Sequence, residues 1–168
     1  MVFEKLKNET PFEMNERVGK YWKENKVFEK SMDNKEKNFV FYDGPIYANA
    51  KPGLHHVFAK TIKDAFCKYQ SMNGKRVLRR MGLDTHGLPV EVNVEKKLGF
   101  NGKADIEKFG IGNFVEECRK TTDTCIDDVK KLTNMMGQFI DYDHPYETCS
   151  NEFIESEWWI INEMHKKG

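Results

Sequence analysis

A pair of histidines beside a glycine, in the stretch PGLHHVFAKTIKD (52–64), is the first feature of this sequence that could do chemistry. His55 and His56 stand where a helix is expected to begin, and a helix N-terminus binds phosphate through free N–H groups and a partial positive charge. We expect His56 to donate to such a phosphate. Neighbouring residues on a helix point about 100° apart, so we expect the two imidazoles not to serve one phosphate together. Lys60, one turn beyond His56, would add positive charge. From the residues alone, a phosphate site and an ordinary polar start of a helix both remain open.

A second candidate is Asp84, which two glycines flank in the stretch GLDTHGLPVE (82–91). A carboxylate that projects from the end of a strand can hold an ammonium group, and a turn aspartate can equally cap its own backbone, so both interpretations stay open. Imidazole and carboxylate groups are also ordinary metal ligands. Because His55, His56, Asp84 and His86 lack a regular ligand spacing, we predict no metal site.

The elements around these two loops form one βαβ unit. The β-prone run 39–42 predicts a buried strand that ends at Asp43-Gly44-Pro45. A helix follows from Leu54, because apolar residues recur at three- and four-residue steps until Asn73-Gly74. The stretch KRVLRR (75–80) predicts the second strand. In such a unit ligands collect at the carboxyl ends of the strands, which is where both loops lie.

Helices account for much of the remaining chain. Thr10 caps a helix predicted over 11–31, and Glu13 completes a capping box. The downstream elements are a helix (113–141), an extended piece (141–150) and a last helix capped by Asn151. We therefore expect an α/β, helix-rich fold with an incomplete parallel sheet. Its predicted parts are an N-terminal helical segment (1–37), the βαβ half of a nucleotide-binding domain (38–100) and a helical extension (101–168).

The composition limits the class of protein. The 168 residues include 27 Lys and Arg and 27 Asp and Glu, so no overall positive charge drives binding to nucleic acid. No apolar run approaches the roughly 20 residues that span a bilayer, and the N-terminus has no apolar centre of the signal-peptide kind. We expect a cytoplasmic protein with no membrane contact. The four cysteines form no CxxC pair, so we expect reduced, mostly buried thiols.

The two loops, in this order and spacing, resemble one family. The stretch FVFYDGPIYANAKPGLHHVFAKTIKDAFCKYQSMNGKRVLRRMGLDTHGLPVEVNVEKKLG (39–99), with YWKENKVFEKS (21–31) and NEFIESEWW (151–159), looks like the N-terminal catalytic half of isoleucyl-tRNA synthetase, a class I aminoacyl-tRNA synthetase. The resemblance implies half of a Rossmann-like catalytic domain. It also implies isoleucine, ATP with Mg²⁺ and tRNA as the partners of the reaction, which forms an aminoacyl-adenylate and transfers the amino acid to tRNA. No bound metal or organic cofactor is expected beyond these.

The resemblance also implies roles for individual residues. Gly44 and Pro45 would line the amino-acid pocket through their backbone, and Asp84 would hold the α-ammonium group of the substrate. The family's His-Ile-Gly-His signature falls on residues 53–56. The implied ATP-binding residues are Ala48, Asn49, Gly53, Leu54, His55 and His56, of which His56 is catalytic.

This chain departs from the family pattern within the signature itself. Gly53 stands where the family has its first histidine, and His55 stands where the family has a glycine that leaves room for the adenine ring. An imidazole at position 55 should collide with the base, and the missing donor would cost about 2–4 kcal/mol of transition-state stabilisation, or about 10²–10³ in rate. Smaller departures are Ile46, Ala50 and Leu83, where proline, glycine and tryptophan are usual. We therefore expect a disabled adenylate site.

Two functions follow from the resemblance. Family members continue for several times this length, with an editing domain, a Lys-Met-Ser-Lys-Ser loop and an anticodon-binding domain, so we expect this chain to supply half of an ATP site and to be inactive alone. Either a second chain supplies the other half of an isoleucine–tRNA ligase, or the protein is a non-catalytic paralogue or remnant that binds tRNA, an amino acid or a partner chain. A small nucleotidyltransferase, which also uses H-x-G-H, is disfavoured because GLDTHGLPVE is not a feature of that family.

Overall fold

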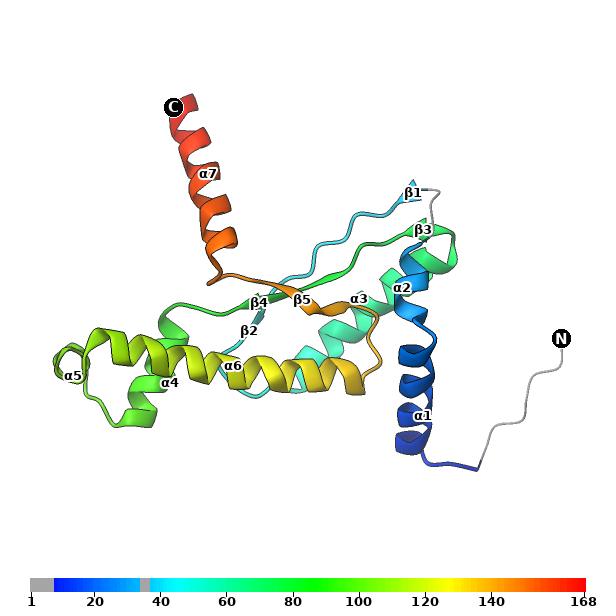
Figure 1. Ribbon diagram of the computed structural model, residues 1–168, viewed down its shortest axis with the longest axis horizontal. Coiled ribbons are helices and arrows are strands. Elements are labelled where there is room, and N and C mark those ends of the chain that lie inside the picture. The colour runs from blue at the N-terminus through cyan, green and yellow to red at the C-terminus, as the bar shows by residue number, and fades with distance from the viewer. Residues whose placement is uncertain (1–7, 34–36) are drawn as a thin grey trace.

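The computed structural model describes residues 8–33 and 37–168, and the remainder of the predicted segment 1–37 lies outside these ranges. Within them the helices are α1 (Pro11–Glu24), α2 (Val27–Met32), α3 (Leu54–Met72), α4 (Leu88–Leu98), α5 (Lys103–Phe109), α6 (Ile111–Met135) and α7 (Asn151–Lys167). The strands are β1 (Lys37–Asn38), β2 (Ile46–Tyr47), β3 (Lys75–Arg76), β4 (Arg80–Asp84) and β5 (Asp141–Glu147). Figure 1 shows their arrangement, with α7 projecting away from the other elements. None of the described helices is long and apolar enough to cross a membrane.

The described strands pair in parallel, which confirms the predicted incomplete parallel sheet and its βαβ unit. β4 lies at the centre of a sheet with the order β2-β4-β5, and β1 pairs with β3 in the same direction. α3 connects β2 to β4. Tyr47 is in register with Asp84, so the residues that follow β2 and β4 leave the sheet at the same edge.

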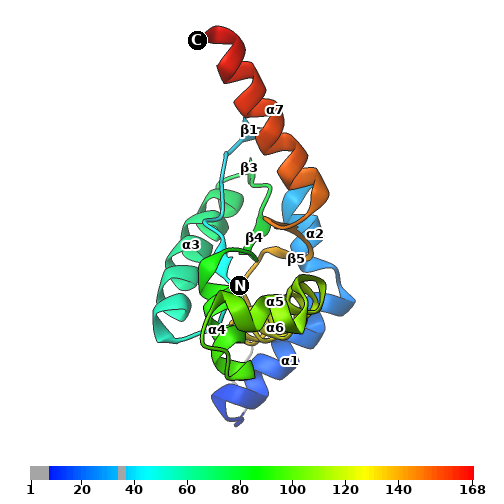
Figure 2. The same cartoon turned by 90° about the vertical axis from the view of Figure 1, so that its left-hand side faces the viewer.

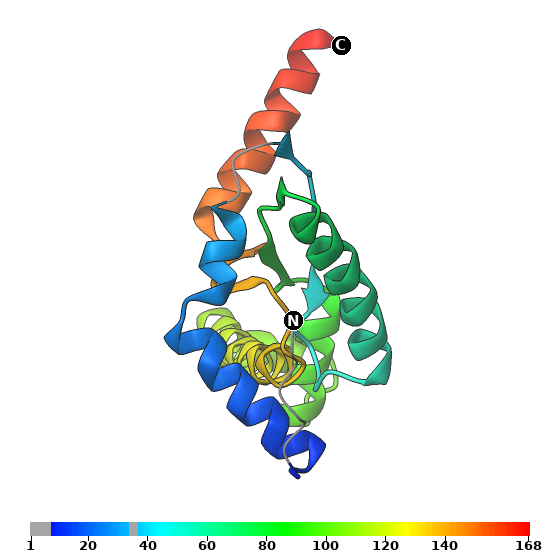
Figure 3. The same cartoon turned by 90° about the vertical axis from the view of Figure 1, so that its right-hand side faces the viewer.

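The strands lie between two groups of helices. Figures 2 and 3 show α3 on one side of the strands and α1 and α6 on the other. The main apolar cluster joins β2 and β4 to α6, so the burial of these side chains holds the sheet edge in place. Its members are Ile46, Ala48, Met81, Leu83, Cys125, Ile126, Val129 and Ile140. The cysteines carry no disulfide, and Cys67 and Cys125 are buried.

The N-terminal helix is divided in two. Thr10 caps α1 as predicted, because its Oγ1 accepts from Glu13 N (3.3 Å) and Glu13 Oε2 accepts from Thr10 N (2.7 Å). The single helix predicted over 11–31 is wrong, since Lys26 adopts a left-handed conformation (φ 50°) and separates α1 from α2. The chain changes direction at this residue, and no sequence periodicity marks it.

The buried strand predicted over 39–42 is also wrong. Strands flank this run, but the run itself is irregular, and the side chains of Val40 and Tyr42 are 70% and 88% exposed. Among the described residues no strand lies on the outer side of this segment, so nothing pairs with it there or covers its apolar side chains. The strand predicted over 75–80 likewise divides into β3 and β4, and β4 continues to Asp84.

The helices after the second loop differ from the predictions in extent. Two of them, α4 and α5, were not predicted, although Pro89 in the first turn and Gly99 at the C-cap are ordinary signals for α4. The long helix predicted over 113–141 begins at Ile111 and ends at Met135. The extended piece over 141–150 contains β5. The cap of α7 is Ser150 rather than Asn151, because Ser150 Oγ accepts from Phe153 N (3.3 Å).

Candidate functional site

The two predicted loops meet at the carboxyl edge of the sheet. Ala48, which is fully buried, donates its N–H to the carbonyl of Asp84 (2.8 Å). The hydroxyl of Tyr47 donates to the carbonyl of His86 (2.6 Å). The carbonyl of Asn49 accepts from Asn93 Nδ2 in α4 (2.7 Å). The backbone that precedes the signature is therefore fixed to the loop that carries the carboxylate.

Asp84 ends β4 with a half-buried carboxylate. Its Oδ1 accepts from the hydroxyl of Thr148 (3.3 Å), and no lysine, arginine or histidine of the described chain lies within 4.0 Å of it as an ion-pair partner. A carboxylate held at a strand end without a cation can accept an ammonium group through a charge-assisted hydrogen bond.

Thr148 is a residue of this site that the sequence did not reveal. Its side chain is 7% exposed, and its Oγ1 accepts from Thr85 N (3.0 Å) and lies 2.8 Å from His86 Nδ1. Thr148 follows β5 directly, so β5 brings a hydroxyl to the loop that follows β4. Thr148 therefore positions Asp84 and the loop that follows it.

Asp43 is a second positioning residue, and its carboxylate is buried. Its Oδ1 pairs with Lys63 of α3, and its Oδ2 accepts from Gly82 N (3.3 Å). Its carbonyl accepts from the hydroxyl of Tyr146 (2.5 Å), so one residue ties together the segment before β2, the helix and two strands. Gly44 and Pro45 follow it and are exposed. Their place in an amino-acid pocket stays a prediction.

The signature residues form the first turn of α3. Gly53 is the N-cap, and its N–H donates to His56 Nδ1 (2.9 Å). Because Nδ1 accepts this bond, neutral His56 carries its proton on Nε2 and can donate from there. Burial, reinforced by His55 and Lys60, holds the pKa of His56 below its usual value. The side chain of Leu54 is 83% exposed.

The two imidazoles lie against each other. Their ring centroids are 3.8 Å apart with the planes tilted by 43°, so the 100° between neighbouring helix positions does not separate the two rings. The reason is that side chains in a helix lean toward its N-terminus, where no earlier turn keeps the rings apart. A Cβ on Gly53 would lie 3.0 Å from His55 Cε1 and 3.1 Å from its Nδ1. The imidazole of His55 therefore occupies the space beside residue 53.

The ammonium of Lys60 is buried and is not presented at the surface beside the predicted phosphate site. Its side chain is 3% exposed, and Nζ donates to Gln138 Oε1 (3.3 Å). Burial lowers the pKa of Lys60, with a smaller lowering from Lys63 and an opposing effect of Asp43. Across residues 8–33 and 37–168, no three histidine, cysteine or acidic side chains are grouped as metal ligands would be.

Comparisons with known proteins agree with these features. The family model of class I tRNA synthetases (I, L, M and V) matches residues 17–168. The chain is 46% identical to the isoleucine–tRNA ligase of Bacteroides thetaiotaomicron over 159 residues, which are 93% of this chain and 14% of that protein. It is 41% identical to the isoleucine–tRNA ligase of Clostridium kluyveri in an alignment of 170 positions that covers 99% of this chain and 16% of that protein.

The fold has a match among solved structures. A LeuRS–tRNA–LeuAMS ternary complex from Agrobacterium radiobacter contains a chain that is similar with a TM-score of 0.69 and 22% identity, over 92% of this chain and 17% of that one. This likeness concerns the fold, a Rossmann-like α/β arrangement. The chain thus spans 14–16% of the length of the isoleucine–tRNA ligases above. It belongs to the class I tRNA synthetases, and over most of its length it is similar to the isoleucine–tRNA ligases among them.

Proposed function

We propose that this chain forms the N-terminal part of the catalytic domain of an isoleucine–tRNA ligase, which activates isoleucine with ATP and Mg²⁺ and transfers it to tRNA. The observation that carries this proposal is the meeting of the two loops, in which Ala48 N donates to the carbonyl of Asp84 (2.8 Å). That contact fixes an unpaired carboxylate relative to the backbone that leads into a histidine-bearing helix start. An amino acid and a nucleotide need these two kinds of group side by side.

The residues would divide the work between the two substrates. Asp84 would hold the α-ammonium group of isoleucine, and Gly44 and Pro45 would line its pocket through their backbone. His56, neutral and protonated on Nε2, would donate to a phosphate oxygen near the N-terminus of α3, where the helix dipole favours negative charge. These roles rest on the signature's position at the carboxyl edge of the sheet.

The altered signature is compatible with this chemistry. The imidazole of His55 lies beside residue 53, where the family has its first histidine, with Cε1 3.0 Å from the position of a Cβ there. Two imidazoles are therefore present at the start of α3, as in the family pattern, although they come from positions 55 and 56. We propose that His55 supplies the donor that Gly53 cannot, so the site is active rather than disabled.

The rest of the family's length would complete the site. The outer edge of the sheet and one face of α3 carry exposed apolar side chains, among them Tyr42 (88%), Phe58 (69%) and Phe66 (62%). Contiguous apolar surface of this kind marks an interaction surface, and an open strand edge offers backbone groups for pairing. We propose that further parts of the synthetase, in the same chain or in a second one, cover this surface.

A chimeric enzyme tests the proposal directly. This chain replaces the matching 14% of the Bacteroides thetaiotaomicron ligase, with which it is 46% identical, and isoleucine-dependent ATP–pyrophosphate exchange is measured. We expect exchange with isoleucine and much less with valine, and its loss in a matched chimera that carries Asp84→Asn. A folded chimera with no exchange, or one that Asp84→Asn leaves unaffected, would contradict the proposal and favour a non-catalytic role.

A further inference from the structure

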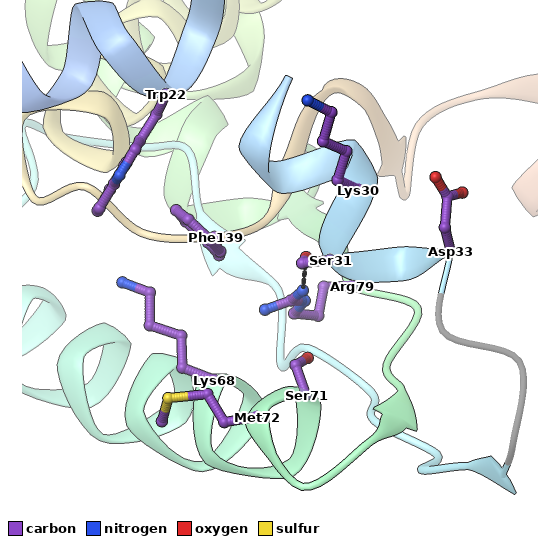
Figure 4. Close-up of a pocket in the computed structure, with 9 residues that line it drawn as sticks. All are labelled: Trp22, Lys30, Ser31, Asp33, Lys68, Ser71, Met72, Arg79 and Phe139. Atoms are coloured by element: carbon purple, nitrogen blue, oxygen red, sulfur yellow. Dashed lines mark hydrogen bonds between the residues drawn. The ribbon is translucent and has the colours of Figure 1, made fainter. Parts of the chain in front are cut away.

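A cavity of about 740 Å³ lies among α1, α2, α3 and the segment that precedes β5. Figure 4 shows the guanidinium of Arg79 joined to Ser31, with Phe139 on one side and the α3 side chains of Lys68, Ser71 and Met72 on the other, and with Trp22 farther away. The lining shares no residue with the two loops of the candidate site. It includes three cationic side chains and one carboxylate, that of Asp33, so its net charge is positive.

Arg79 is buried without an anionic partner. Its side chain is 1% exposed, and Nη2 donates to Ser31 Oγ (2.6 Å). Nε and Nη1 have no acceptor within the described part of the chain, although arginine carries five N–H donors in a fixed fork. The rings of Phe28 and Phe139 lie 5.3 and 5.8 Å from its Cζ. Aromatic faces attract a cation but accept no strong hydrogen bond, so the donors stay unsatisfied.

The electrostatic surroundings of Arg79 agree with a missing partner. Burial lowers the pKa of Arg79, and the smaller effects of Cys67 and Asp64 only partly oppose it. Asp64 is already engaged, since its Oδ2 lies 2.5 Å from Lys68 Nζ and its Oδ1 accepts from Phe139 N (2.9 Å). The nearest acid is therefore bonded elsewhere and does not neutralise the guanidinium.

Two further donors lie in the same cavity wall. The hydroxyl of Ser71 is buried and has no hydrogen-bond partner among residues 8–33 and 37–168. Lys68 Nζ donates to the carbonyl of Gly137 (3.0 Å) and lies 4.6 Å from the centroid of Phe139. Met72 is 79% exposed, and rotation of this unbranched side chain would open a path to the guanidinium.

We propose that this cavity is an oxyanion site, in which Arg79 is the anchoring donor and Ser71 and Lys68 complete the hydrogen bonds to a carboxylate or phosphate group. The planar fork of arginine matches both groups, and the rings of Trp22 and Phe139 provide an apolar wall beside it. The group comes either from a free anion or from an aspartate or glutamate side chain in another part of the longer synthetase.

Anion titration of the chain tests this site. Trp22 lines the cavity, so its fluorescence reports binding once Trp158 and Trp159 are replaced by phenylalanine. Sodium phosphate and sodium acetate are titrated separately at constant ionic strength, with sodium chloride as the balancing salt. We expect a saturable response to at least one of them and a Kd raised by about tenfold or more in Arg79→Met, because a charge-assisted hydrogen bond is lost.

Control variants separate binding from folding. Lys103→Met removes a cation whose side chain is 87% exposed in α5, and it should leave the Kd unchanged. Should Arg79→Met not fold, Ser71→Ala and Lys68→Met carry the same test with smaller increases in Kd. A chain with no saturable response to either anion, or a response that the cavity variants leave unaltered, overturns the proposal.

The chimeric ligase distinguishes the two sources of the oxyanion. Phosphate or acetate binding that is seen with the chain and is still seen with the chimera assigns the site to a free anion. Binding that disappears in the chimera assigns it to an acidic side chain of the longer protein, and Arg79→Met should then lower the melting temperature of the chimera more than that of the chain.

Discussion

Exchange of the residues at positions 53 and 55 tests whether the imidazole of His55 stands in for a histidine at 53. Gly53 has φ −99° and ψ 177°, an extended conformation that any residue adopts, so a side chain there meets no backbone strain. It meets the ring of His55, whose Cε1 and Nδ1 lie 3.0 and 3.1 Å from the Cβ position. Because the exposed ring of His55 has to shift, we expect Gly53→His to cost about 0.5–1.5 kcal/mol of folding free energy.

The other single variant has a different cost. His55→Gly removes the ring that lies 3.8 Å from that of His56, and it places a glycine in the first turn of a helix, for about 0.5–1 kcal/mol. In the double variant the new imidazole at 53 finds the space that His55 has left. The two changes should therefore couple favourably by about 0.5–1 kcal/mol, as expected for residues in contact.

Two measurements compare the unaltered chain with the two single variants and the double variant. Urea unfolding of the chain and its three variants gives the coupling energy. Pyrophosphate exchange in the corresponding chimeric ligases gives the effect on catalysis. We expect His55→Gly to lower exchange by about 10²-fold, as loss of one transition-state donor does, and the double variant to recover most of it. Additive stabilities, or full exchange without His55, would refute the idea that His55 replaces the first histidine.

Three further predictions concern residues that position the site. Gly82→Ala should destabilise the chain by about 1–3 kcal/mol, because a methyl group there would overlap the ring of Tyr146. Gly44→Ala is the matched control, since a Cβ at Gly44 has no atom within 4 Å. Equal unfolding midpoints for the two variants would contradict the predicted overlap. Thr148→Val should cost about 1–3 kcal/mol and raise the KM for isoleucine in the chimera, whereas Thr148→Ser should do neither. Because the pKa of His56 is lowered, the contribution of the neutral imidazole to the free energy of unfolding is complete above pH of about 6.5 and declines as pH falls through the lowered pKa. Unfolding measured against pH should show less of this decline in His56→Gln.

Local sequence patterns predicted the order of the elements at the site but not where each strand and helix begins and ends. Glycines and a periodic apolar helix identified the βαβ unit, because these signals act within a few residues. The length of a strand depends on its neighbours, and the segment around Val40 has none on its outer side in the described chain, so its β propensity was not realised. On either side of the break at Lys26, Trp22 of α1 and Phe28 of α2 pack against the same distant residue, Phe139, which no local pattern reveals.

The residues that position the site were beyond sequence reasoning for a related reason. Thr148 bonds to Thr85, 63 residues earlier, and Tyr146 bonds to Asp43, 103 residues earlier. Neither pair has a spacing that a motif would reveal. The hydroxyl of Thr148 reaches the carboxylate of Asp84 only because β5 pairs in parallel with β4. The order of the strands in the sheet therefore had to be known first.

The two departures in the signature depend on each other in space. Compared position by position, the chain lacks one histidine and has gained another where a glycine is usual, which suggested two separate defects. In the structure, the imidazole of His55 lies beside residue 53, with 3.0 Å between its Cε1 and the position of a Cβ there. A side chain at 53 would therefore crowd the exposed ring of His55, which would have to shift. In the proposed function, the chemistry needs an imidazole beside the helix N-terminus, and we propose that attachment at position 55 in place of 53 preserves it.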